Sequence, residues 1–333
     1  MAISTIDNNG VNLGQLGNRN LIQNGNFSIS QRGTSFTADN VYTLDRWKSS
    51  DGTGGSPART LSQQVFTLGQ TDVPNAHYYL RHAQTGASTN GNSSLVQKIE
   101  DVTRSAGQTI TLSFYAKANA SMTVDVRFIQ DFGSGGSPSS DVTLTETITI
   151  GTSWTKFTLT KAIGSLSGKT LGTDGLQTSS LTIDMEFQPT GTFTFELAQV
   201  QLEVGDTATP FEHRSYGAEL ALCQRYFQYV YDSSTSAIAP GRGASGGDAL
   251  VVAMPIPVVL RATPAVASTG AYYVYDPNSR NNATPTSVTV SNYPTNGSLI
   301  ALYFAFSGVM CDDDRVLLIA SSGTTTLTLD AEL

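Results

Sequence analysis

The stretch LAQVQLEVGDTATPFEHRSYGAELALCQRYFQYVY, residues 197–231, decides how this chain is organised. It begins as a strand in which apolar and polar residues alternate, and it then changes to helical spacing, with apolar side chains at Tyr216, Leu220 and Cys223. This spacing predicts a short helix over residues 215–225 and a strand directly after it. A lone helix between two long series of strands indicates a junction between two domains.

Short alternating strands fill the chain on both sides of this junction. In residues 109–118, TITLSFYAKA, every second side chain is apolar, which is typical of a strand with one buried face. Residues 21–33, LIQNGNFSISQRG, are assigned to the first such strand. The turns between the strands are rich in Gly, Asn, Ser and Pro, a pattern that favours an antiparallel jelly roll. The fold class predicted is therefore all-β, a jelly-roll β-sandwich followed by a smaller antiparallel β domain.

The predicted organisation has four parts. Residues 1–20 are polar and show no regular spacing of apolar residues that would indicate a helix or a strand. They are therefore predicted to form an arm that is held by a partner protein rather than by a core of their own. Residues 21–213 form the jelly roll and residues 214–232 the helix–strand junction. Residues 233–333 form the second β domain, which opens with a loop over 233–248.

Composition excludes several classes of function. The net charge of −8 argues against binding of nucleic acid, because phosphates are neutralised by clustered Lys and Arg. No apolar run approaches the roughly 20 residues needed to span a bilayer, and the longest, residues 299–306, is predicted to be a buried strand. The start of the chain lacks the pattern of a secretory signal, so synthesis in a cytoplasm is expected. Cys223 and Cys311 are expected to be reduced and buried.

Several short motifs in order resemble one protein family. They are NLIQNGNF at 20–27, QRG at 31–33, DRW at 45–47, QKIE at 97–100, LSFYAK at 112–117, VQLEVG at 200–205, PFE at 210–212, CQRYF at 223–227, LRATP at 260–264 and LDAEL at 329–333. Together they resemble bacteriophage tail-fibre and virion-appendage proteins that contain a carbohydrate-binding-module-like jelly roll.

The resemblance implies a non-enzymatic structural protein of a phage virion, made in the host cytoplasm. It implies attachment to other virion proteins through residues 1–20 and assembly as a homotrimer. The favoured role is a tail fibre or appendage that contacts host-surface glycans. A capsid decoration or head-fibre protein is the alternative, and a polysaccharide-degrading tailspike is a third, although no pair of carboxylates with the spacing of a glycosidase stands out.

The sugar-binding relatives hold a structural calcium ion with acidic residues after the opening NG motif and in the closing strand. Ser28 and the pair Ala198 and Gln199 occupy those places here. Because calcium prefers charged oxygen ligands, we expect no metal at this site. No cofactor is expected either.

Aromatic side chains beside amides and charged groups are suited to sugars, which present both CH faces and hydroxyls. The candidates in the jelly roll are His77, Tyr78, Tyr79, Tyr115, Arg127, Gln130 and Phe132. Those in the second domain are Tyr272, Tyr273, Tyr275 and Tyr293. Packing of these aromatics in the core is the alternative, and Trp47 and Trp154 are assigned to the core. Four aromatic residues at the junction are candidates for the trimer interface, namely Tyr226, Phe227, Tyr229 and Tyr231.

Two further patterns are assigned to plain structure. Residues 241–246 match GxGxxG, but that motif binds dinucleotides only between a strand and a helix, so a flexible loop is predicted. The acidic run Asp312, Asp313 and Asp314 is assigned to a solvated turn, since adjacent carboxylates repel each other. The histidines, His77, His82 and His213, lack the spacing of a metal site and are assigned to the surface.

Overall fold

The computed structural model describes residues 19–51, 57–86, 93–174, 178–187, 191–233, 237–243, 248–276, 279–283, 285–293, 299–307 and 316–333. It divides the chain into unit 1, which ends at Glu219, and unit 2, which begins at Leu220. The division falls inside the predicted junction. The predicted arm lies almost wholly outside the described residues, as does Cys311.

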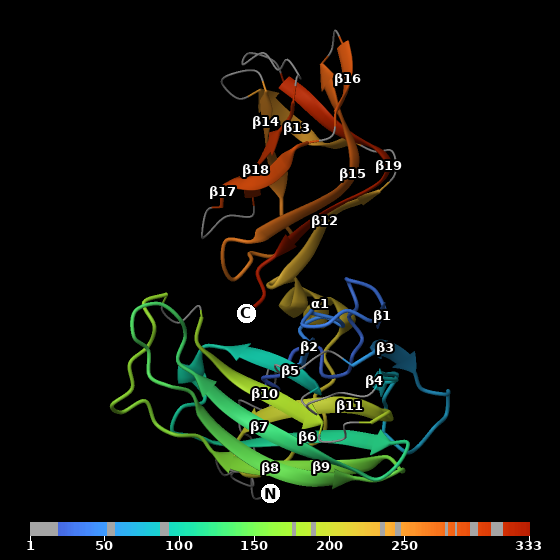
Figure 1. Ribbon diagram of the computed structural model, residues 1–333, viewed down its shortest axis with the longest axis vertical. Coiled ribbons are helices and arrows are strands. Elements are labelled where there is room, and N and C mark those ends of the chain that lie inside the picture. The colour runs from blue at the N-terminus through green and yellow to red at the C-terminus, as the bar shows by residue number, and fades with distance from the viewer. Residues whose placement is uncertain are drawn as a thin grey trace, which may run out of the picture. The chain divides into compact units, whose positions relative to one another are not determined.

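Unit 1 is a jelly-roll sandwich of two antiparallel sheets, drawn as two layers in Figure 1. The six-stranded sheet has the order β1-β3-β4-β11-β6-β9. Its strands are β1 (Ser35–Phe36), β3 (Arg59–Val65), β4 (Tyr78–Gln84), β11 (Phe193–Val204), β6 (Thr109–Ala118) and β9 (Thr155–Ala162). The five-stranded sheet has the order β2-β5-β10-β7-β8. Its strands are β2 (Lys48–Asp51), β5 (Ser93–Glu100), β10 (Ser180–Phe187), β7 (Met122–Asp131) and β8 (Val142–Ile150). A short 3₁₀ helix, η2 (Val102–Arg104), follows β5.

The predicted apolar face of β6 is confirmed, but the opposite face is not exposed throughout, since Thr111 and Ser113 are also buried. Ile110, Leu112, Phe114 and Ala116 are buried against the other sheet, and the residues between them lie on the outer face. Leu80, Phe195 and Leu202 of neighbouring strands in the same sheet, and Ile183 of the facing sheet, belong to the same core. Burial of these apolar side chains stabilises the sandwich, at about 25 cal/mol per Å² removed from water.

Unit 2 is all-β apart from the end of the helix. Its eight-stranded sheet has the order β16-β15-β19-β13-β14-β18-β17, and β12 also pairs with β19. The strands are β12 (Phe227–Ser233), β13 (Ala237–Gly243), β14 (Ala249–Pro255), β15 (Ala265–Asp276), β16 (Ser279–Ala283), β17 (Ser287–Asn292), β18 (Leu299–Ala305) and β19 (Val316–Asp330). The apolar run at 299–306 is confirmed as a strand, but only one of its faces is fully buried, through Ile300, Leu302 and Phe304, while Leu299 is 52% exposed.

The predicted loop at 233–248 is wrong in its central part. Gly241 pairs with Val252 of β14 and Leu317 of β19, so the GxGxxG match begins inside a sheet. A Cβ on Gly241 would lie 2.9 Å from the side chain of Leu250. The glycine is therefore there to let two strands approach closely, and the strand context does not fit a dinucleotide site.

The predicted helix is confirmed as α1 (Tyr216–Gln224). The Ser215 hydroxyl accepts a hydrogen bond from the Ala218 amide at 3.3 Å, which satisfies one of the free donors of the first turn. Cys223 is buried, as expected. No helix within the described ranges is long and apolar enough to cross a membrane.

The predicted strand at 21–33 is wrong, because this segment is a series of turns. Asn24 and Phe27 have positive φ angles of 53° and 56°, which are incompatible with a strand. The Asn24 side chain donates to the carbonyls of Ile29 and Asp45 at 2.8 and 3.0 Å, and it accepts from the Ile29 amide at 2.9 Å. An asparagine stabilises such a turn because its amide replaces backbone partners.

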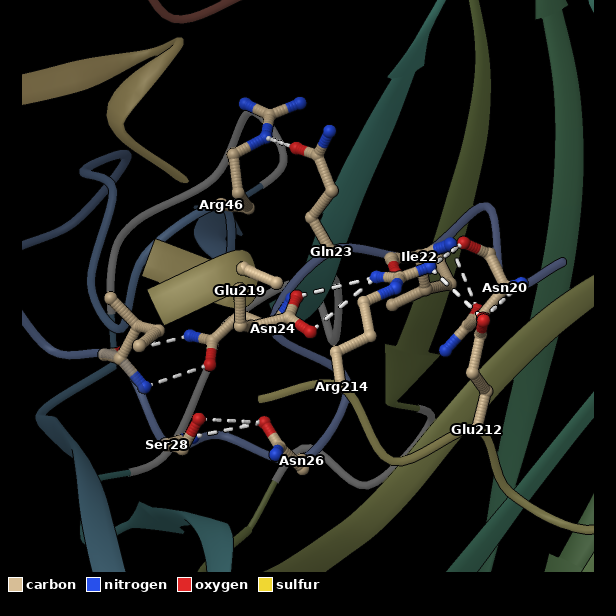
Figure 2. Close-up of polar contacts among 12 residues, drawn as sticks. Asn20, Ile22, Gln23, Asn24, Asn26, Ser28, Arg46, Glu212, Arg214 and Glu219 are labelled. Carbon is tan, nitrogen blue, oxygen red and sulfur yellow. Dashed lines mark hydrogen bonds and ion pairs between the residues drawn. The ribbon is translucent and has the colours of Figure 1, made fainter. Parts of the chain in front are cut away.

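This turn holds the last residues of unit 1 through a buried polar network (Figure 2). Glu219 accepts a hydrogen bond from the Asn24 amide. Arg214 lies within 3.4 Å of Glu219 and 3.3 Å of Glu212, and it also donates to the Ile22 carbonyl. The network pairs its charges with one another, which buried charges require. The motif NLIQNGNF and the segment after β11 therefore fold as one structural element.

Candidate functional site

The outer face of the six-stranded sheet carries a row of side chains across β11, β6 and β9. Ser113 and Tyr115 lie on this face because Phe114, between them, points into the core. Tyr115 pairs with Ala198 of β11 on one side and with Lys156 of β9 on the other. Ala198 is small, so the ring of Tyr115 stands beside a depression in the sheet.

A bulge in β11 forms the centre of this depression. The pairing of β11 with β6 shifts register between Ala198 and Gln201, and Gln199 has a positive φ of 49°. The Gln199 side chain donates to the Pro74 carbonyl at 2.5 Å. This bond ties the loop before β4, including Asn75 with its φ of 55°, to the sheet. Strained backbone held in this way is a frequent property of binding sites.

The segment after β11, residues 206–213, forms the opposite wall. Glu203 accepts from the amide and the hydroxyl of Thr209 at 2.8 and 2.7 Å. Gln201 accepts from the Glu212 amide at 2.7 Å. These bonds fold the segment back over its own strand, so that its proline and phenylalanine overhang the sheet.

The floor and the two walls enclose a groove of about 430 Å³, which we call the β6 groove. Its lining residues are Pro74, Asn75, Ser113, Tyr115, Lys156, Gln199, Ala208, Pro210, Phe211 and His213. A smaller recess of about 120 Å³ shares Asn75, Gln199 and His213 with it. The recess is completed by Asn26, Ser28, Ala76, His77 and Tyr78. All these residues belong to unit 1.

The lining of the groove combines aromatic surface with amide and hydroxyl groups. Tyr115 and Phe211 supply aromatic surface, while Asn75 and Gln199 carry amides and Ser113 a hydroxyl. Ring faces pack against the CH groups of a pyranose, and amides and hydroxyls bind its hydroxyls. The groove is also large enough for a small ligand.

Few ionisable side chains set the charge of the groove. Neither its lining nor that of the recess contains Asp or Glu among the described residues. Burial lowers the pKa of His213, so this imidazole is neutral at pH 7 and binds through hydrogen bonds rather than charge. Phe211 packs against it at a centroid distance of 5.0 Å. Lys156 supplies the one full positive charge of this lining.

A second aromatic cluster lies on the same sheet. Phe66, Tyr79 and Trp154 pack with centroid distances of 4.7 to 5.6 Å. The Lys117 ammonium is 5.3 Å from the Trp154 ring and 3.0 Å from the Glu196 carboxylate. The assignment of Trp154 to the core is therefore wrong, since its ring is half-buried on the outer face. Trp47 is fully buried, as predicted.

Three of the predicted sugar-binding residues of unit 1 meet at this site. Tyr115 lines the groove, and His77 and Tyr78 line the recess. Tyr78 also packs partly against the core. Tyr79 belongs to the aromatic cluster instead.

The other three candidates of unit 1 lie in or beside the five-stranded sheet, so a single site for all seven is wrong. Arg127 pairs with Asp184 at 2.6 Å. Burial raises the pKa of Asp184, while the guanidinium acts in the opposite direction. Gln130 is buried and donates to the Gly164 carbonyl at 3.0 Å, and Phe132 is fully buried. The alternating pattern did not show on which sheet each strand lies.

Of the four candidates in unit 2, the side chains of Tyr272 and Tyr293 are described. Tyr272 is 1% exposed and packs at 5.5 Å from Phe304, so its assignment to a binding tip is wrong. Tyr293 donates to the Leu260 carbonyl at 2.8 Å, and burial raises its pKa. The side chains of Tyr273 and Tyr275 and the run Asp312, Asp313 and Asp314 lie outside the described part.

Two of the aromatic residues proposed for the trimer interface are buried within unit 2. Tyr226 is 2% exposed and Phe227 is 5% exposed, so they have no free surface for a trimer contact. Tyr229 is 38% exposed and packs edge-on against Phe227 at 5.4 Å. The side chain of Tyr231 is outside the description. The sequence shows that this segment is rich in aromatic residues. It does not show that Tyr226 and Phe227 are buried within unit 2.

The residues at the places of the family calcium ligands, Ser28 and Gln199, both line the recess. The Ser28 hydroxyl donates to Asn26 at 2.9 Å. Within the described residues, no group of three or more His, Cys, Asp or Glu side chains is placed to hold a metal. Amide and hydroxyl oxygens without a carboxylate are weak ligands for a hard cation.

Most residues of the groove have no direct signal in the sequence. Asn75, Lys156 and His213 come from three separate segments and match no motif of their own, whereas Phe211 lies in the PFE motif at 210–212. His213 was assigned to a simple surface position, and Gln199 was considered only as the replacement of a metal ligand. The turn motif TPFE at 209–212 was the one available sign that the chain folds back here.

Comparisons with known proteins show a likeness of fold. No family model matches the chain, and no curated protein matches it in sequence. Among solved structures, the xylan-binding domain CBM22-1 of Paenibacillus barcinonensis Xyn10C is 12% identical, with a TM-score of 0.34, over 57% of this chain and 96% of that chain. The family 11 carbohydrate-binding module of Clostridium thermocellum, in complex with a mixed-linked tetrasaccharide, is 14% identical, with a TM-score of 0.33, over 53% and 98%.

The enzymatically active domain of tailspike protein 4 from bacteriophage CBA120 is 14% identical, with a TM-score of 0.38. The match covers 56% of this chain and 22% of the tailspike chain. At these identities the likeness concerns the fold alone. The chain is thus an all-β protein whose jelly roll resembles those of carbohydrate-binding modules and of a phage tailspike domain.

Proposed function

We propose that this protein binds glycans through the β6 groove and acts as a structural, non-enzymatic component of a phage virion. The observation that carries the glycan part is the lining of the groove, where Tyr115 and Phe211 stand beside the amides of Asn75 and Gln199. No carboxylate pair accompanies them among the described lining residues, so the proposal contains no hydrolytic step.

The virion part of the proposal is supported by the sequence motifs that resemble tail fibres and appendages. We favour a tail fibre that contacts host-surface glycans. Residues 1–20 remain the proposed attachment to other virion proteins. Labelling of purified particles with an antibody to the chain, viewed by electron microscopy, separates this role from that of a capsid decoration protein, which would be labelled over the head.

The glycan site predicts that Tyr115→Ala reduces saccharide binding about five- to tenfold, because stacking on an aromatic ring contributes roughly 1 to 1.5 kcal/mol. Tyr115→Phe, which keeps the ring, should retain most of the affinity. Binding is measured on an array of bacterial surface glycans and then by calorimetry with the best ligand. Tyr216→Ala is the matched control, since Tyr216 is 64% exposed and outside the lining.

Equal binding by the wild-type protein and Tyr115→Ala would place the sugar elsewhere. Absence of binding to any glycan, by a protein that is folded and located on the particle, would favour the decoration role.

We also propose a homotrimer, on the strength of the family resemblance, since Tyr226 and Phe227 no longer support it. Light scattering should then give three times the chain mass of 35.3 kDa. Three linked sites would raise the effective concentration of ligand, so a weak single site would bind a polysaccharide tightly. A monomeric mass at micromolar concentration would contradict the proposed trimer. It would not affect the proposal that the β6 groove binds glycans.

A further inference from the structure

The charge of the β6 groove differs from the charge of the chain. The protein carries 27 acidic and 19 basic residues, yet the described lining of the groove and recess contains no acid. Lys156 lies in the same lining. An acidic protein that keeps carboxylates out of one groove makes that groove locally attractive to anions.

Lys156 differs from the neighbouring lysines of the same sheet in having no carboxylate partner in the described structure. Lys117 is 3.0 Å from Glu196, and Lys161 is 2.8 Å from Glu146. Lys156 is exposed and pairs across the strands with Tyr115, on the floor of the groove. Its ammonium group is therefore available to a ligand that stacks on that ring.

The rest of the lining requires the anion to be part of a sugar rather than a free ion. A simple phosphate would use the ammonium group and leave the aromatic surface of Tyr115 and Phe211 in water. A pyranose that carries a carboxylate or a phosphate would use both, with its ring on the aromatic surface and its hydroxyls near Asn75 and Ser113.

We propose that the β6 groove selects acidic saccharides, with Lys156 pairing with the negative group and Tyr115 stacking on the same sugar unit. This inference rests on the proposed function and adds the class of sugar. It assigns Lys156 a role in specificity, because a hydrated ammonium acts as a point charge that a neutral sugar does not need.

The test uses saccharides in matched pairs. An oligogalacturonate is compared with its carboxyl-reduced form, and a phosphorylated oligosaccharide with its dephosphorylated form. The wild-type trimer or monomer, as purified, should bind one acidic member about fivefold or more tightly than its neutral partner at low salt. This preference should shrink as salt is raised to 0.5 M, because screening weakens an exposed ion pair.

Lys156→Gln should abolish the preference, so that the acidic and neutral members of the pair bind equally. Lys169→Gln is the control, since it makes the same change of net charge at a residue outside the lining, where the Lys169 ammonium lies 5.0 Å from the Phe132 ring. Which pair shows the preference distinguishes a uronic acid from a sugar phosphate.

Two results would overturn the inference while the proposed function stands. One is equal binding of acidic and neutral partners by the wild-type protein, and the other is a preference that survives in Lys156→Gln. Failure to bind either member of any pair, together with no effect of Tyr115→Ala on any glycan, would reject the glycan site and the preference with it.

Discussion

Gly25→Ala is expected to destabilise unit 1 by about 3 kcal/mol or more, because a Cβ at this position has no space. It would lie 2.1 Å from the Val200 carbonyl oxygen and 3.2 Å from the Ile22 side chain. The obstacle is backbone, which cannot rotate away as a side chain can. The Val200 amide also donates to the Gly25 carbonyl at 2.9 Å, so a shift of either segment breaks this bond.

The effect is measured by urea unfolding followed by tryptophan fluorescence. Both tryptophans of the chain, Trp47 and Trp154, lie in unit 1, so the signal reports on this unit alone. Gly151→Ala is the control, since nothing lies within 4 Å of a Cβ there, and its free energy of unfolding should change by less than about 0.5 kcal/mol. If Gly25→Ala lowers the free energy of unfolding by less than about 1 kcal/mol, the backbone of this turn can shift to accommodate a Cβ, and the prediction is wrong.

His82 is expected to make unit 1 lose stability as the pH falls. The side chain is fully buried, and burial, reinforced by the nearby Arg59 charge, lowers its pKa from 6.5 to about 3. It packs against Phe187 and Phe193 at 4.7 and 5.3 Å. Its assignment to the surface is therefore wrong.

The direction of the pH dependence of stability follows from where His82 takes up a proton in the folded and in the unfolded chain. Below pH 6.5 the unfolded chain takes up a proton at His82, whereas the folded chain does so only near pH 3. The contribution of the neutral imidazole is thus complete above pH 6.5 and is lost progressively between pH 6.5 and 3, by about 4 to 5 kcal/mol in total. Burial raises the pKa of Asp45 and Asp184, and these groups act in the opposite direction.

The decisive measurement is therefore a difference between variants. His82→Leu should flatten the dependence of the free energy of unfolding on pH between 7 and 4, relative to the wild-type protein. The exposed residue His77 gives the control His77→Leu, which should leave the slope unchanged. Parallel slopes for the wild-type protein and His82→Leu would show that folding does not lower the pKa of His82.

The main features of the fold were predictable because they depend on local periodicity. The alternation in 109–118 predicted a strand with one buried face, and the spacing of Tyr216, Leu220 and Cys223 predicted α1 within one residue at each end. The sequence predicted a strand at 21–33 because it contains apolar residues. It missed the turn there, because the positive φ of Asn24 and Phe27 depends on bonds to distant residues such as Asp45.

The sequence by itself determined an all-β chain with one junction helix, an acidic surface and a set of residues suited to sugars. Only the tertiary structure decided which of them meet. Tyr115 and Arg127 each lie in a segment in which apolar and polar residues alternate. The pairing of their strands nevertheless places them in different sheets. The β6 groove exists because Gln199 and the segment 206–213 form bonds across the sheet, and such contacts between distant segments leave no periodic signal in a sequence.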